Sequence, residues 1–284
     1  MSSEIIFPSL DGFEPTRQTL QLYSRVISAV PRTHGEFHPK WWHVSLGVQP
    51  DGLITGAVAL LEGGELRIKM DLVAHKILLF ADGQVTDAFS MLAGKTSTAM
   101  ADEVLAAVAR LGLHGEVNRE KFENDEPREY DPSRVAKFLR VLVNADRIFR
   151  ARRAALSGEV GPVQLWPHGF DLAFEWFGTR VQEYEEQGEA NAIPAQLNLG
   201  FYPGSPGLAP YFYSNPWPFE EDVLLGEALP DGASWHTEGW QGAILPYEVL
   251  MEDEDAEKRL HAFAARVFEV SLPTLIHGWE AGPR

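Results

Sequence analysis

The alternation of hydrophobic and polar residues is most informative at residues 41–48, where the chain reads WWHVSLGV. Residues two apart in a strand share a face, so one face would be apolar, with Trp42, Val44, Leu46 and Val48. The opposite face would combine two polar-tipped rings with two very small residues: Trp41, His43, Ser45 and Gly47. This second face fits a pocket wall, and it fits somewhat better a strand whose small residues admit a closely packed helix.

Apolar residues at spacings of three and four predict helices elsewhere in the chain. Pro15 begins a pattern at 15–30 that Pro31 should stop, and the apolar face of 41–48 should pack on this helix. Thr96 or Ser97 can cap a second helix that ends at Gly112. Asp131 and Pro132 open the strongest helix, whose apolar stripe is Phe138, Val141, Leu142, Ala145, Ile148 and Phe149. A last helix carries Leu260, Phe263, Ala264, Val267 and Phe268.

Short alternating segments separated by turn residues predict strands between these helices. They lie at 53–60, 66–72, 75–81, 85–91, 163–166, 170–177, 196–202, 211–214 and 235–247, and Asp82-Gly83 predicts a hairpin turn. Close spacing and tight turns indicate antiparallel pairing. We therefore expect an α+β fold, with antiparallel sheets covered by helices, and not a doubly wound parallel sheet.

The order helix, strands, helix occurs twice, which is consistent with a degenerate duplication. Residues 119–130 are polar and charged, without apolar periodicity, and predict a linker between an N-terminal half, 1–118, and an aromatic-rich C-terminal half, 131–284. The aromatic surplus of the second half needs a covering surface. We therefore expect the halves to fold as one cooperative unit.

Composition excludes several functions. A formal net charge of -17 opposes binding to nucleic acid or anionic membranes, and the absence of cysteine excludes thiolate catalysis, thiolate metal sites and disulfides. The opening MSSEIIFPSL lacks the basic residues and long apolar run of a signal peptide, and no apolar run is long enough to cross a membrane. We expect a soluble cytoplasmic protein, and the pattern leaves its oligomeric state open.

Several separate motifs occur in one order: WWHVSLGV, DLVAHKILLFADG, DPSRVAKFLRVLVNADRIF, GPVQLWPHGFDLAFEWFG and WQGAILPYEVL. Together they resemble an uncharacterised bacterial family, domain-of-unknown-function family 5996, from about the first helix to near the C-terminus. The resemblance implies no activity, ligand or catalytic residue. It does favour treating both halves as one unit.

A metal site is the first chemistry to consider, because His34, Glu36, His38 and His43 lie within ten residues. The spacing is not HExxH, and glycine and proline in this segment oppose the helix that would align such a pair. We expect a solvated loop here, and we assign neither a metal nor a cofactor.

The second chemistry to consider is glycoside hydrolysis by a pair of carboxylates. Asp171 and Glu175 would share one face of strand 170–177, but their Cα atoms would lie about 13 Å apart, beyond the roughly 5–9.5 Å of catalytic carboxylate pairs. One of them can still act as a lone base or bind a cation, although facing solvent is the simplest interpretation. No serine lies in a nucleophile-elbow context.

Histidines beside tryptophans give the remaining site hypothesis. We expect His43, His168 and His236 to supply acid–base chemistry. The predicted ligand-binding residues are Trp41, Trp166, Asp171, Tyr202, Tyr213, Trp217 and Trp235. The protein would then be a small-molecule enzyme or binding protein with a pocket between the halves. The alternative is a non-catalytic interaction protein whose acidic loops, 183–189, 220–222 and 252–257, bind a basic partner. Convergence of the histidines would favour the first class.

Overall fold

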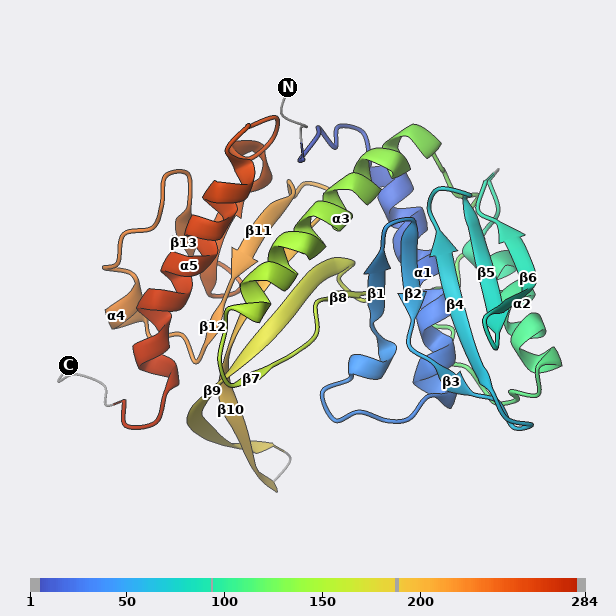
Figure 1. Ribbon diagram of the computed structural model, residues 1–284, viewed down its shortest axis with the longest axis horizontal. Helices are drawn as coiled ribbons and strands as arrows, with labels where there is room; N and C mark the ends of the chain where they lie inside the picture. The colour runs from blue at the N-terminus through green and yellow to red at the C-terminus, as the bar shows by residue number, and fades with distance from the viewer. Residues whose placement is uncertain (1–5, 93, 187–188, 280–284) are drawn as a thin grey trace. The chain divides into compact units, whose positions relative to one another are not determined.

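The computed structural model describes residues 6–92, 94–186 and 189–279, and it has the expected α+β fold with antiparallel strands (Figure 1). The chain forms two compact units. Unit 2 combines Pro8–Asn144 with Gln164–Asp171, and unit 1 contains the other described residues. No helix in the described part of the chain is both long and apolar enough to cross a bilayer.

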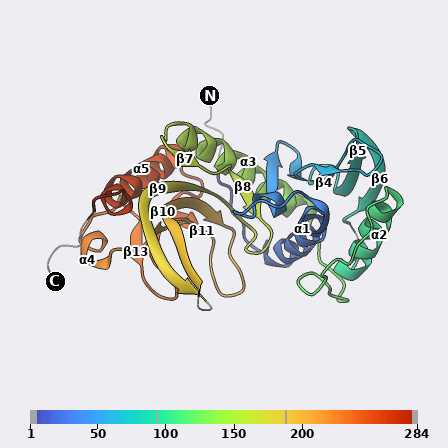
Figure 2. The same cartoon turned by 90° about the horizontal axis from the view of Figure 1, so that it is seen from below.

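Unit 2 is an antiparallel sheet with two helices on one face (Figure 2). Its strands follow the order β8 (Gln164–Trp166), β1 (Leu46–Gln49), β2 (Gly52–Thr55), β4 (Glu65–Asp71), β5 (Lys76–Ala81) and β6 (Gln84–Ser90), and β3 (Val58–Ala59) pairs with β4. Helix α1 (Glu14–His34) contacts β2 and β4, and α2 (Ser97–Arg110) contacts α1 and β6. The predicted turn at Asp82 and Gly83 is confirmed, since both have positive φ, 49° and 76°.

The strand predicted at 41–48 is wrong over its first half. Trp41 has φ 58°, Trp42–Val44 form a short 3₁₀ turn (η1), and β1 begins only at Leu46. A tertiary contact accompanies this turn, because the hydroxyl of Ser28 on α1 donates a hydrogen bond to the carbonyl of Val44 at 2.5 Å. Val44 and Leu46 are buried as expected, but Trp42 is half-exposed. The 41–48 segment therefore does not present two clean alternating faces.

Proline does not stop α1 where we expected. The helix passes through Pro31 and ends at His34, and the N–H of Gly35 then donates to the carbonyl of Pro31 at 2.9 Å. A proline costs an internal hydrogen bond but can be accommodated near a helix end, where few further bonds are at stake.

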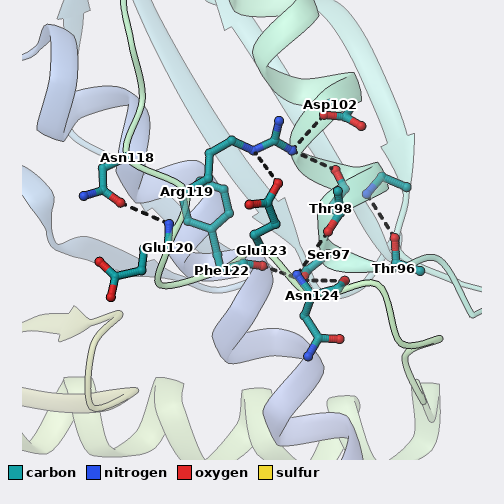
Figure 3. A network of polar contacts seen from close by, with 11 residues as sticks. Thr96, Ser97, Thr98, Asp102, Asn118, Arg119, Glu120, Phe122, Glu123 and Asn124 are labelled. Atoms are coloured by element: carbon teal, nitrogen blue, oxygen red, sulfur yellow. Dashed lines mark hydrogen bonds and ion pairs between the residues drawn. The ribbon is translucent and has the colours of Figure 1, made fainter.

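Residues 119–130 have no helix or strand, yet they are held to α2 by side-chain contacts (Figure 3). The hydroxyl of Ser97 donates to the carbonyl of Phe122 at 2.6 Å, and the guanidinium of Arg119 lies 2.7 Å from the carboxylate of Asp102. Phe122 is itself buried. This segment therefore belongs to the packed structure of unit 2.

The far end of the same segment is also attached within unit 2. The hydroxyl of Tyr130 lies 3.0 Å from Nδ1 of His75, and burial raises the pKa of Tyr130 well above its usual range. We predicted a linker at 119–130, whereas the division into compact units falls at Asn144 and Ala145, inside α3 (Pro132–Ala154).

Helix α3 begins as predicted. The carboxylate of Asp131 accepts hydrogen bonds from the backbone N–H groups of Ser133, at 2.8 Å, and Arg134, at 3.3 Å. The predicted apolar stripe is fully buried: Phe138, Val141, Leu142, Ala145, Ile148 and Phe149.

The strands of unit 1 are also antiparallel, with α5 (Ala256–Leu275) and the end of α3 on one face (Figure 2). Its strands follow the order β13 (Ser234–His236), β14 (Gly242–Pro246), β11 (Tyr211–Ser214), β10 (Glu189–Tyr202) and β9 (Asp171–Glu186). The short β12 (Pro216–Trp217) pairs with β10, β7 (Glu159–Val160) pairs with β9, and a short helix, α4, spans Glu221–Leu224. The strand predicted at 235–247 is two strands, and the one predicted at 170–177 continues to Glu186.

Alternation along these strands separates two faces. The side chains buried toward the helices are Phe174, Trp176, Leu197, Leu199, Phe201, Phe212 and Leu245. Trp176 packs edge-on against Phe268 of α5, with ring centroids 5.2 Å apart. Along each strand, the residues that alternate with these buried ones form the other face of the sheet, which carries the candidate site.

The N-cap of α2 provides a first testable prediction. The hydroxyl oxygen of Thr96 accepts a hydrogen bond from the backbone N–H of Ala99 at 3.0 Å. Thr96→Ala should therefore lower the free energy of unfolding by about 0.5–2 kcal/mol in a urea titration. Thr96→Ser keeps the cap and should stay close to wild type. Equal losses for both variants would show that the cap does not stabilise the protein.

Candidate functional site

The sequence-predicted site residues fall in both units. Tyr202, Tyr213, Trp217, Trp235 and His236 lie in unit 1, and Trp41, His43, Trp166, His168 and Asp171 lie in unit 2. The structure groups them into smaller clusters, each within one unit.

The largest cluster is on the unit 1 sheet face that lies opposite α5. We call it the aromatic face, and it consists of Tyr202, Tyr211, Tyr213, His236 and Trp240. The ring of Tyr211 lies 5.3 Å from Tyr202, 6.1 Å from Tyr213 and 6.2 Å from Trp240 between centroids. Trp240 also packs against His236, at 4.7 Å. All five side chains are partly exposed.

Two glycines allow these rings to lie against the strands. Gly200 pairs directly with Tyr213, and a Cβ at Gly200 would lie 2.2 Å from Cζ of that ring. A Cβ at Gly242 would lie 2.6 Å from the Trp240 ring. Any side chain at either position would displace a ring, so the glycines fix the shape of the aromatic face.

The charge on this face is negative. Glu175 is opposite Asn198, and Glu159 is opposite Phe177, which places both carboxylates on the side of the sheet that carries Tyr213. No lysine or arginine occupies the described strand positions of this face between Glu159 and Pro246. Aromatic rings and carboxylates thus lie on the same side of this sheet.

Trp217 and Trp235, both predicted to bind a ligand, lie on different sides of the unit 1 sheet. Trp217 is opposite Gln196 on β12, near the aromatic face. Trp235 alternates onto the other side of the sheet, where its indole N–H donates to the carbonyl of Glu227 at 2.9 Å and its ring contacts Phe219. Trp235 therefore has a structural role there. The sequence shows Tyr211 and Trp240 among the aromatic residues of the second half, but our predicted site residues did not include them, although Tyr211 stands two residues from Tyr213 and so shares its face.

A second cluster surrounds His43 in the loop after α1. Its ring centroid lies 5.6 Å from both Phe37 and Trp41, and the guanidinium of Arg32 lies 5.1 Å from the Trp41 ring. Burial and the charge of Arg32 lower the pKa of His43.

The third cluster is at the end of β8. The rings of Trp166 and His168 lie 6.0 Å apart, and the carbonyl of His168 accepts hydrogen bonds from Gln21, at 2.9 Å, and Arg25, at 2.6 Å. Asp171 follows, with a carboxylate oxygen 2.5 Å from where a Cβ of Gly169 would lie. His43, His168 and His236 thus each pack against an aromatic neighbour, and their convergence on one pocket stays a prediction.

Two imidazoles of the histidine-rich loop accept hydrogen bonds from its backbone. Nδ1 of His43 accepts a hydrogen bond from the N–H of His38 at 3.3 Å, and Nδ1 of His38 accepts one from the N–H of Lys40 at 3.1 Å. In the described part of the chain, no group of three or more potential metal ligands comes together.

Comparison with known proteins gives a family and no activity. The profile of a family of unknown function (DUF5996) matches residues 7–281. The chain belongs to this family. The match spans both compact units, so the DUF5996 unit includes the aromatic face and the His43 cluster together. No curated protein and no solved structure matches the chain.

Proposed function

We propose that this DUF5996 protein binds a small organic cation, such as a methylated amine, on the aromatic face of unit 1. The observation that carries the proposal is the combination of five partly exposed rings with the carboxylate of Glu175 on one sheet face. His236 supplies the imidazole that acid–base chemistry at this face would use.

The physical basis is the attraction between a cation and the negative face of an aromatic ring. Each such contact contributes about 0.5–2 kcal/mol, more as the cation loses water. Ring faces also bind sugars, but Glu175 and Glu159 lie on the same side of the sheet as the Tyr211 to Trp240 stack, and no lysine or arginine occupies a described strand position there, which favours a positively charged ligand. The net charge of -17 raises the local concentration of cations further.

The alternative function, binding of a basic partner by acidic loops, has weaker support. Several carboxylates of loops 220–222 and 252–257 already pair with arginines of unit 1: Glu220 with Arg180 at 2.6 Å, Glu257 with Arg147 at 2.6 Å, and Asp253 with Arg259 at 2.9 Å. These pairs reduce the negative charge that a basic partner would meet.

The test is a titration of the protein with choline, glucose and acetate, followed by tryptophan fluorescence and by thermal shift. Choline should bind, whereas glucose and acetate should not. Trp240→Ala should weaken choline binding roughly 2- to 30-fold, the equivalent of one cation–π contact.

Trp41→Ala is the matched control, because it also removes a partly exposed loop tryptophan but lies in unit 2. It should leave choline binding unchanged. Tighter binding of glucose than of choline, or equal effects of the two variants, would refute the proposal.

A further inference from the structure

The loop after α1 presents a second group of rings to solvent, with a different electrostatic character. We call residues Arg32, Phe37, Trp41 and His43 the loop cluster. Phe37 is 64% exposed and Trp41 is 46% exposed, which is high for large apolar side chains. The two rings meet edge to face, with centroids 5.5 Å apart.

The backbone holds these rings in a fixed arrangement. Trp41 has φ 58°, a left-handed conformation that costs a residue with a side chain about 1–3 kcal/mol. Stacking of the flanking residues supports this conformation of Trp41: the ring centroids of His38 and Trp42 lie 4.4 Å apart. Strain of this kind is concentrated at functional sites.

The charge of the loop cluster is positive. Arg32 is exposed, its guanidinium lies over the Trp41 ring, and it forms no ion pair with a carboxylate in the described part of the chain. A guanidinium over an aromatic ring without a carboxylate partner keeps N–H groups available for a carboxylate or sulfonate.

We propose that the loop cluster binds a small planar aromatic anion, with its ring against Phe37 and Trp41 and its acidic group at Arg32. This site belongs to unit 2, whereas the aromatic face belongs to unit 1, and its charge preference is the opposite. Exposed rings beside cations also occur on membrane-binding proteins, but the net charge of -17 opposes an anionic membrane.

The experiment uses the full chain and three matched probes: naphthalene-2-sulfonate, its trimethylammonium counterpart and cyclohexanesulfonate. Saturation-transfer NMR should show binding of the naphthalenesulfonate to wild type. The cation lacks the interaction with Arg32 and cyclohexanesulfonate lacks the stacking, so both should bind at least roughly 5-fold more weakly at the loop cluster.

Phe37→Ala and Arg32→Gln should each weaken naphthalenesulfonate binding roughly 5-fold or more, and Arg32→Gln should remove the preference for the anion. Phe37→Ala is preferred to Trp41→Ala as the test, because it leaves the strained backbone position at Trp41 unchanged. Trp240→Ala is the control and should not change this affinity, whereas it should weaken choline binding.

Three outcomes would overturn the proposal. They are equal binding of the anionic and cationic naphthalenes to the Trp240→Ala variant, in which cation binding at the aromatic face is weakened, equal binding of cyclohexanesulfonate, and unchanged affinity in both variants of the loop cluster. Cosedimentation with phosphatidylserine vesicles that Phe37→Ala abolishes would identify a membrane contact instead.

Discussion

Leu46→Ala is expected to lower the free energy of unfolding by about 2–5 kcal/mol, as truncations in packed cores do. Leu46 is fully buried at the start of β1, where it pairs with Thr55 of β2 on one side and Leu165 of β8 on the other. The lost methyl groups leave a cavity that strands hydrogen-bonded on both sides cannot easily close.

A urea titration of wild type and variant measures this loss. Leu61→Ala is the matched control, because Leu61 is 80% exposed in the same unit and its truncation should change stability by less than about 0.5 kcal/mol. A loss below about 0.5 kcal/mol for Leu46→Ala would mean that β1 is not part of the core.

Helices were predictable from the sequence because their signals are local. In α3, the carboxylate of Asp131 caps the first turn and the apolar stripe from Phe138 to Phe149 is buried, as the spacing indicates. The hairpin at Asp82 and Gly83 was predictable for the same reason, since the turn needs two residues that tolerate positive φ.

The misread segments depend on contacts between residues far apart in sequence. The 3₁₀ turn at Trp42–Val44 contacts Ser28 of α1, and Trp41 adopts positive φ without the glycine or asparagine that usually marks it. Strand period alone therefore placed Trp41 and His43 on a face that does not exist.

The candidate site was only partly predictable for a similar reason. Tyr202, Tyr213 and His236 were identified by residue type, but the aromatic face is assembled by pairing of β10, β11, β14 and β13. The predicted single strand at 235–247 hid the turn that returns Trp240 over Gly242 and onto Tyr211. Which rings share a surface follows from register, which a single sequence does not specify.

The C-terminal fragment 131–284, expressed alone, should be aggregated or molten. Residues on both sides of this cut build the core of unit 2. Phe138 of α3 is fully buried, and its ring lies 4.6 Å from Phe13 and 5.5 Å from Phe170 between centroids. The fragment keeps Phe138 and Phe170 but loses Phe13, α1 and the strands β1 to β6 of unit 2.

The exposed area would be large and apolar, because β8 also loses its neighbour β1, where Leu165 pairs with Leu46. An exposed strand edge beside buried-type phenylalanines favours aggregation. Coexpression of residues 1–130 should restore soluble material, since it returns the missing partners of Phe138 and Leu165. A fragment 131–284 that is soluble alone, with dispersed NMR resonances and a cooperative thermal transition, would show that the second half folds independently.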